Sequence, residues 1–210
     1  MNTTIDILGK IIGSVPRVKL MRLFLFHPDI GFTKEQLLKK TKITPALFKG
    51  ELSLLEKATF IEKKEVMLAL NSKQGGVKKK KGIVYVLNKD FPLLEPMRGL
   101  LIESELIGLQ ELSHRFKSTG KIKLFVVSGL FMKEDRSALD LLIVGDRLDT
   151  GSVQKTILQV EAEIGKELRY ATFSVEEFMY RMKMYDKLLR DTFDFPHKKL
   201  INQMPVGVFL

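Results

Sequence analysis

The chain contains 210 residues, enough for one large domain or two small ones, and its 45% hydrophobic and 29% charged residues indicate a globular protein. It has no cysteine, which excludes disulfides, thiolate metal sites and cysteine nucleophiles and fits the cytoplasmic location that we expect. A net charge of +10 favours a polyanionic partner, and no apolar run approaches the ~18–20 residues that a membrane span needs.

The positive charge is concentrated in the N-terminal part of the chain. Residues 1–88 contain 17 Lys and Arg against 7 Asp and Glu, whereas residues 89–210 contain 18 of each class. This asymmetry indicates a basic binding module followed by a neutral domain with another task. A lysine-rich solvated surface would give the same composition, but the placement of the lysines favours nucleic acid.

Three helices are expected before residue 60. Residues 16–27 predict a helix opened by Pro16, and its apolar face is broad enough to be buried. Thr33 begins a short second helix, with Gln36 in the position that completes a capping box. The third helix begins after Thr44. Its apolar residues recur at helical spacing and form an inward stripe of Phe48, Leu52 and Leu55.

The periodicity changes after this third helix. Residues 60–70 alternate in part, and residues 82–88 are β-branched and aromatic, which predicts two strands. Between them Gly75-Gly76 is a turn signal, and the four consecutive lysines Lys78–Lys81 follow it. We therefore predict a β-hairpin with a basic tip and flank.

Three helices and a hairpin in this order resemble a winged helix-turn-helix domain. The resemblance covers residues 16–88 and is carried by TKEQLLKKTKITPALFKGELSLLEKATFIEKK, in which a leucine-rich phrase precedes a strand. It implies that the third helix enters the major groove of DNA and that the hairpin, or wing, lies along the adjacent backbone or minor groove. The residues expected to contact DNA are Lys42, Thr44, Lys49, Ser53, Lys57, Lys73, Lys78, Lys79, Lys80 and Lys81.

The outer face of the predicted third helix offers little for base readout. It has no arginine or asparagine that would make a bidentate contact to a base edge. Lysines that bind phosphates position a protein on DNA without specifying a sequence. We therefore expect sequence readout to be modest, or to depend on DNA shape.

Residues 91–120 are predicted to connect the two domains. After Pro96 the sequence has a long apolar helical face that extends to residue 117, and Ser118-Thr119-Gly120 then interrupts it. Such a helix either supports a homodimer or packs on its own domains. We expect a homodimer.

Residues 121–210 alternate strand and helix patterns, which indicates a mixed α/β domain. Strands are predicted at residues 123–129, 138–146 and 167–174, and helices at residues 151–165 and 175–193. The second of these helices is capped by Ser174, with Glu177 in the capping-box position.

The stretch SALDLLIVGD, residues 137–146, resembles the metal-binding strand of minimal nucleotidyltransferases. In that superfamily two aspartates on alternate residues share one side of the strand and hold magnesium. Only the second is present here, as Asp140, because Ala138 stands in the position of the first. The resemblance therefore implies a domain that keeps the frame of the family without its metal site or a cofactor.

The phosphate-binding turn of that family is also altered. The Gly-Ser order is inverted as Ser128-Gly129, and bulky apolar residues follow it. Ser128, Gly129 and Asp140 then retain at most a contact to a nucleotide-like ligand. A structural role for Asp140 is favoured, in which it caps a turn or pairs with Arg136 or Arg169.

The predicted fold class is α+β, with a winged helix-turn-helix domain over residues 1–90, a connecting helix over residues 91–120, and a nucleotidyltransferase-like domain over residues 121–210. The expected function is transcription regulation by a homodimer that binds double-stranded DNA. Its C-terminal domain senses a ligand or supports assembly and is not expected to be an enzyme. Two alternatives stay open: an active magnesium-dependent nucleotidyltransferase whose winged helix holds the acceptor, and a scaffold whose winged helix docks protein.

Overall fold

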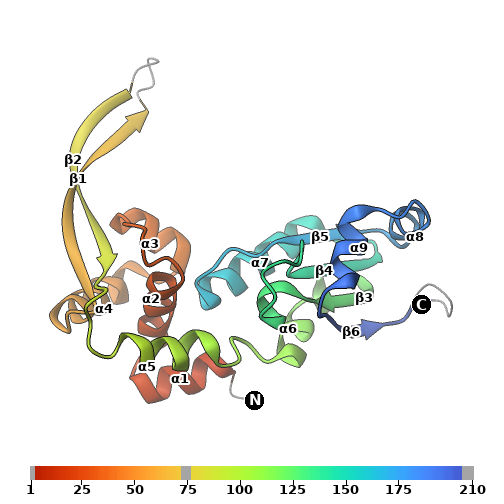
Figure 1. Ribbon diagram of the computed structural model, residues 1–210, viewed down its shortest axis with the longest axis horizontal. Helices are drawn as coiled ribbons and strands as arrows, with labels where there is room; N and C mark the ends of the chain where they lie inside the picture. The colour runs from red at the N-terminus through yellow and green to blue at the C-terminus, as the bar shows by residue number, and fades with distance from the viewer. Residues whose placement is uncertain (1–2, 72–76, 205–210) are drawn as a thin grey trace. The chain divides into compact units, whose positions relative to one another are not determined.

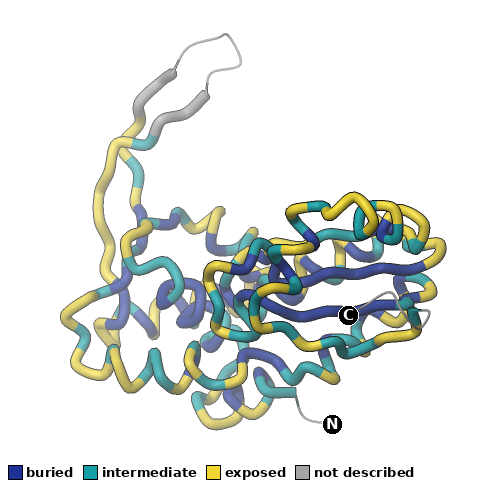
Figure 2. The backbone as a smooth tube through the Cα atoms, turned by 45° about the vertical axis from the view of Figure 1, so that its right-hand side comes forward, coloured by how far each residue is buried: buried dark blue, intermediate teal, exposed yellow. Residues whose placement is uncertain are grey.

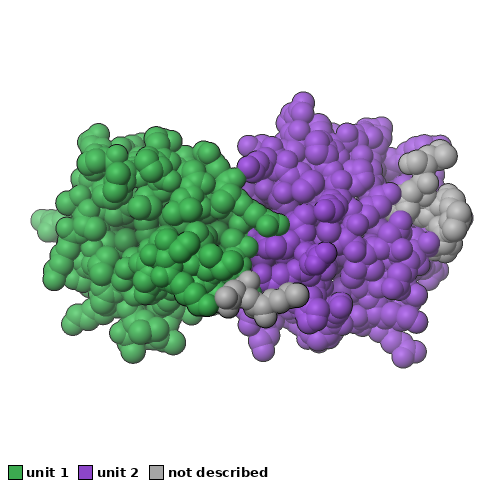
Figure 3. Space-filling model, turned by 90° about the horizontal axis from the view of Figure 1, so that it is seen from below, with its two compact units in different colours: residues 1–106, 161–166 green, residues 107–160, 167–210 purple. Residues whose placement is uncertain are grey.

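The structure is a computed structural model that describes residues 3–204 with the exception of residues 72–76. The chain has an α+β fold and divides into two compact units, residues 1–106 with 161–166 and residues 107–160 with 167–210 (Figure 3). The division falls within the segment that was predicted to connect two domains. None of the helices in the described ranges is long and apolar enough to cross a bilayer.

The first unit begins with four helices, α1 (Thr4–Ile12), α2 (Val15–Phe26), α3 (Lys34–Thr41) and α4 (Pro45–Lys57) (Figure 1). The last three confirm the predicted helices, and Thr33 and Gln36 form the predicted reciprocal capping box at the start of α3. Helix α1 was not predicted from the sequence. Its signal is a second reciprocal capping box, between Thr3 and Asp6.

The two strands β1 (Ile61–Asn71) and β2 (Val77–Leu87) pair antiparallel and confirm the predicted hairpin. β2 begins five residues earlier than predicted, so Lys78–Lys81 lie within the strand and not at the tip. The base of the hairpin is tied to the helices by a bridge between Phe32 and Tyr85. Gly82 permits Leu68 to fold across β2, since an added Cβ would stand 2.2 Å from its Cδ1.

The predicted long connecting helix is broken into separate pieces. α5 (Leu94–Arg98) continues into a π-helical turn, η1 (Gly99–Glu103), and α6 (Leu109–Arg115) begins only after an irregular segment. Arg22 of α2 accounts for the break. Its fully buried guanidinium donates hydrogen bonds to the carbonyl oxygens of Leu101, at 3.0 Å, and Leu106, at 3.1 Å. A straight helix would direct these carbonyls along its own axis and away from Arg22.

The second unit contains a mixed sheet. After α6 its elements are η2 (Lys117–Thr119), β3 (Lys121–Val127), η3 (Gly129–Met132), β4 (Leu141–Asp146), α7 (Thr150–Ile164), β5 (Tyr170–Phe173), α8 (Val175–Lys183), α9 (Lys187–Asp194) and β6 (Lys198–Asn202). The strand order is β5-β4-β3-β6, with β4 and β5 parallel and the other pairs antiparallel. The central strands are buried (Figure 2), and Phe178 of α8 and Leu189 of α9 join Leu142 and Val144 in one core.

Two expectations for the second unit were wrong. The predicted helix 175–193 is interrupted, because Tyr185 has a left-handed φ of 52° and Asp186 caps a new helix. Ser174 caps α8 as expected. In a capping box the Glu177 carboxylate would accept from the backbone N–H of Ser174, but here it accepts from Arg181. The edge strand β6 was not predicted either.

Candidate nucleic-acid interface

Helix α4 presents one face to the core and the other to solvent. Phe48, Leu52 and Leu55 are buried, which confirms the inward stripe, and they pack in the core that surrounds α2. Four residues predicted to contact DNA are exposed on the other side or at the N-terminus of the helix: Thr44, Lys49, Ser53 and Lys57. Their exposure follows from the 3.6-residue period, which separates them from the buried stripe.

Among the described residues, the acidic side chains of α4 have ion-pair partners and its lysines do not. Glu51 pairs with Arg17 of α2 at 2.9 Å, and Glu56 pairs with Lys63 of β1 at 2.6 Å. The hydrogen bond that Lys63 donates to the Glu56 carboxylate raises the pKa of Lys63. Lys49 and Lys57 make no ion pair within the described part of the chain. The acidic residues of the helix are therefore compensated internally, and its exposed lysines are not.

The N-terminus of α4 is also open to an external acceptor. Thr44 occupies the N-cap position, but its side chain makes no capping hydrogen bond, and Pro45 is the first helical residue. The first backbone N–H groups of a helix carry partial positive charge and have no intrahelical partner. Lys42, which ends α3 with a left-handed φ of 53°, is exposed just before this turn.

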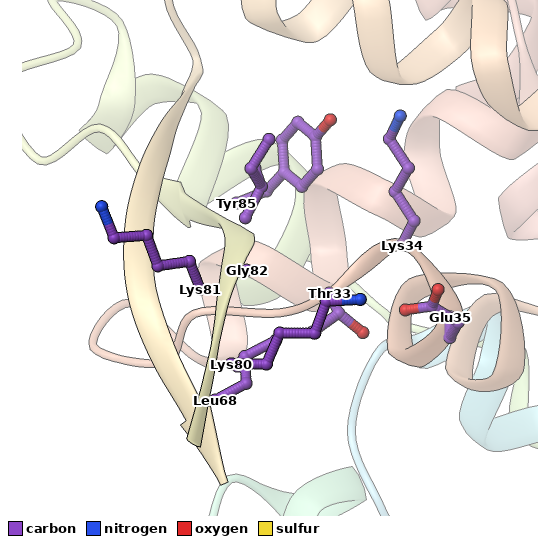
Figure 4. A pocket seen from close by; sticks show the side chains of 9 residues that line it. Thr33, Lys34, Glu35, Leu68, Lys80, Lys81, Gly82 and Tyr85 are labelled. Carbon is purple, nitrogen blue, oxygen red and sulfur yellow. The ribbon is translucent and has the colours of Figure 1, made fainter. Parts of the chain in front are cut away.

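A groove of about 530 Å³ lies between the start of α3 and the hairpin (Figure 4). It is lined by Thr33, Lys34, Glu35, Leu68, Lys80, Lys81, Gly82, Ile83 and Tyr85. The side chain of Lys80 extends toward Thr33, whereas Lys81 points to the other side of the strand (Figure 4). This arrangement follows from strand geometry, in which successive side chains point to opposite faces.

The described part of the hairpin places some of the predicted wing residues. Lys80 and Lys81 are exposed in β2. Lys78 and Lys79 pair through their backbones with Leu70 and Ala69, and their side chains lie outside the described part. Lys73 lies outside the described residues altogether.

The candidate ligand residues of the second unit lie together but contact one another internally. Asp140 is 2% exposed, and each of its carboxylate oxygens accepts two hydrogen bonds. Oδ1 accepts from the backbone N–H of Leu130 and from Nη2 of Arg169, at 2.8 and 2.9 Å. Oδ2 accepts from the backbone N–H and Nε of Arg169, at 2.8 and 3.2 Å. Asp140 therefore pairs with Arg169, the second of the two arginines that the sequence offered.

Ser128 and Gly129 belong to the same internal network. The Ser128 hydroxyl lies 2.8 Å from the carbonyl oxygen of Pro196 and 2.9 Å from the hydroxyl of Ser137. Gly129 has a left-handed φ of 48°, and an added Cβ would lie 2.2 Å from Oδ1 of Asp140. The glycine is thus required by the close approach of the buried carboxylate.

Arg136, the other candidate partner of Asp140, binds Glu134. Its Nε and Nη2 donate to the two carboxylate oxygens of Glu134, both at 2.8 Å, and these bonds lower the pKa of Glu134 to about 2. No group of three or more His, Asp or Glu side chains suited to a metal ion occurs in the described residues.

Replacing Asp140 with asparagine is expected to lower the free energy of unfolding by about 2–3 kcal/mol. The amide would direct an N–H₂ group at donors that now find a buried carboxylate oxygen. Urea denaturation of Asp140→Asn measures the loss, with the exposed Asp135→Asn as a control that should change little. Magnesium-dependent incorporation of labelled nucleotide by the wild-type protein, lost in a still-folded Asp140→Asn variant, would instead support the transferase hypothesis.

Sequence reasoning missed two groups that shape the first unit. Arg22 interrupts the apolar stretch LMRLFLF of α2, and an arginine flanked by apolar residues in a helix predicted to be buried was the available signal. The pairing of Arg17 with Glu51 joins residues far apart in the chain, and no local pattern indicates it.

No family model, curated protein or solved structure matches the chain.

Proposed function

We propose that the protein is a cytoplasmic transcription regulator that binds double-stranded DNA through its first unit. In this proposal α3 and α4 form a helix-turn-helix, α4 enters the major groove, and the β1–β2 hairpin is the wing. The observation that carries the proposal is the charge balance of α4, whose carboxylates have internal partners while Lys49 and Lys57 have none among the described residues.

Two further features support DNA binding by the exposed face of α4 and the hairpin. The uncapped N-terminus of α4 leaves the backbone N–H of Ala46 for a phosphate oxygen, since Pro45 has no N–H and the N–H of Leu47 donates to the carbonyl oxygen of Thr44. Exposed lysines on β2 extend the positive surface along the hairpin, as a wing on the DNA backbone requires. A homodimer would place two such units on half-sites about one helical turn apart, and this remains part of the proposal.

For the second unit we propose a nucleotidyltransferase-like frame without catalytic activity. The internal bonding of Asp140 supports this, because a carboxylate that already accepts four hydrogen bonds has no oxygen lone pair left for magnesium. Ligand sensing or support of assembly is the proposed task of this unit.

Reversing one charge on α4 tests the DNA-binding proposal. Lys49→Glu is expected to weaken binding to a fluorescent random-sequence duplex about tenfold at about 50 mM salt, since one phosphate contact is lost and one repulsion is added. The plot of log Kd against log salt should also become less steep. Anisotropy titrations over a range of salt concentrations measure both quantities.

The matched control is Lys183→Glu, which makes the same charge change at an exposed position of the second unit. It should leave the affinity within about twofold, because α8 is not expected to contact DNA. If the wild-type protein shows no salt-dependent duplex binding, or if both variants lose affinity equally, the proposal for α4 is wrong.

A further inference from the structure

The exposed face of α4 has an apolar side that the lysines do not explain. Leu47 and Leu54 are 55% and 41% exposed and lie seven residues apart, so they occupy the same side of the helix two turns from each other. Single exposed leucines are common on protein surfaces. Two aligned leucines on the helix proposed to enter DNA indicate an apolar contact made outside the chain.

Gly50 lies between these leucines, and the chain itself gives no reason for it. A Cβ added at Gly50 would meet no atom within 4 Å, and its backbone is not in the left-handed region. Glycine inside a helix is less favourable than alanine. A glycine that neither packing nor backbone conformation requires is explained by a partner that approaches the helix backbone closely.

The polar groups on this face limit the kinds of base contact it makes. The exposed residues of the helix are Pro45, Ala46, Leu47, Lys49, Gly50, Ser53, Leu54 and Lys57. They include none of the side chains that make bidentate contacts to guanine or adenine, apart from lysine to guanine. Apolar contact is therefore the main readout available on the side of Leu47 and Leu54.

The positive charges on this face indicate what kind of partner binds to it. Lys57 lies one turn after Leu54, Lys49 lies at the opposite edge of the exposed face of α4, and Lys42 precedes the helix. All three lack ion-pair partners in the described ranges, so the occupant combines apolar groups with flanking negative charge. The major groove at A·T pairs meets this description, since the C5-methyl of thymine is apolar and phosphates border the groove. An apolar protein surface would leave the three lysines without counter-charge.

We propose that α4 recognises thymine methyl groups in the major groove through Leu47 and Leu54, with Gly50 permitting close approach of the helix to the base edges. The preferred DNA is therefore rich in A·T pairs whose thymines face α4. This inference rests on the proposed function and specifies the class of DNA sequence that the same face reads.

Removing the methyl groups from the DNA tests the proposal without altering the protein. The probes are two duplexes of about 24 base pairs, one of alternating dA and dT and one of alternating dA and dU, which lacks only the C5-methyl groups. Wild-type protein is expected to bind the dT duplex about fourfold more tightly for each methyl that a leucine buries. The double variant Leu47→Ala, Leu54→Ala should bind both duplexes equally.

The control variant Ile11→Ala shortens a side chain that is 69% exposed on α1 and should keep the preference for dT. Equal affinity of the wild-type protein for the two duplexes overturns the inference, while the proposed function stands if binding remains salt-dependent. No binding to either duplex removes the proposed function itself. A dT preference that survives the double variant overturns the assignment to the leucines.

Gly50→Ala supplies a second readout that separates binding from folding. Alanine favours the helix, so the melting temperature should rise, whereas affinity for the dT duplex should fall about tenfold, the effect of one unfavourable contact at a base pair. A variant that is more stable and binds the dT duplex as well as the wild type would overturn the close approach at Gly50.

Discussion

Substituting all four of Lys78–Lys81 with glutamine is expected to weaken duplex binding about a thousandfold at about 50 mM salt. Each lysine that neutralises a phosphate releases a counterion and contributes about −0.9 to the slope of log affinity against log salt. The slope should therefore become less negative by about two to four. Anisotropy titrations of a random-sequence duplex at several salt concentrations measure both changes.

A control of equal charge separates local contact from net charge. The variant Lys117→Gln, Lys155→Gln, Lys183→Gln, Lys187→Gln removes four exposed lysines of the second unit. It should change affinity only a few-fold, through the long-range field, which salt screens. Equal losses in the two quadruple variants would show that total charge matters and that the hairpin is not a wing.

The single variants Lys80→Gln and Lys81→Gln refine this prediction. The two side chains are adjacent in β2 but point to opposite sides of the strand (Figure 4). A hairpin held against one DNA backbone would use one of them more than the other. We expect their effects on affinity to differ several-fold, and equal effects would argue against a fixed orientation of the hairpin on DNA.

Arg22→Met is expected to lower the free energy of unfolding of the first unit by about 3–5 kcal/mol. Arg22 also donates to the carbonyl oxygen of Glu163 at 3.1 Å, within residues 161–166 of the same unit. With methionine, the two buried carbonyl oxygens and the partly buried one of Glu163 would lose a donor, at about 1–3 kcal/mol for each buried group before relaxation. Urea denaturation followed by circular dichroism measures the change.

Burial of Arg22 has a cost that these hydrogen bonds offset. Removal from water lowers the pKa of the guanidinium to about 10, and its Nη2 has no partner in the described part of the chain. Arg22→Lys keeps the charge but cannot reach several carbonyls in a planar fork, so it should also destabilise. Arg190→Met, at an exposed position of α9, should change stability by less than about 0.5 kcal/mol. A loss below about 1 kcal/mol for Arg22→Met would contradict the role of Arg22 as the link to the connecting segment.

The helices with strong local signals were predictable from the sequence. The capping residues Thr33 and Ser174 set the starts of α3 and α8, and the apolar stripe of Phe48, Leu52 and Leu55 correctly gave the buried side of α4. These signals are local, because a capping side chain and its N–H partner are three residues apart.

The elements that depend on distant contacts were not predictable in the same way. The break after α5 follows from Arg22, which lies 79 residues before its acceptor Leu101. The strand β6 has the sequence KKLIN, whose lysines weaken the strand signal, and it forms by pairing with β3. Lys78–Lys81 were assigned to the tip and flank of the hairpin, since a lysine run does not show that it pairs with apolar residues across the strand.

The candidate site was predictable in its residues but not in its balance of charge. The outward lysines of α4 follow from helical periodicity. That Glu51 and Glu56 are engaged by Arg17 and Lys63, which leaves those lysines as the uncompensated charge, required the tertiary contacts. For Asp140 the sequence offered two arginines, and only the three-dimensional arrangement distinguishes Arg169 from Arg136.

Site-specific cross-linking to DNA tests the central claim most directly, that the outer face of α4 lies in the groove of a duplex. The natural chain has no cysteine, so Ser53→Cys carries a photoactivatable probe at one defined position of α4, and Gln154→Cys carries it on α7 as the comparison. If α4 lies in the groove, the probe at residue 53 cross-links to duplex DNA and the probe at residue 154 does not. Cross-linking from residue 154 alone, or from neither position under conditions in which the duplex is bound, would contradict it.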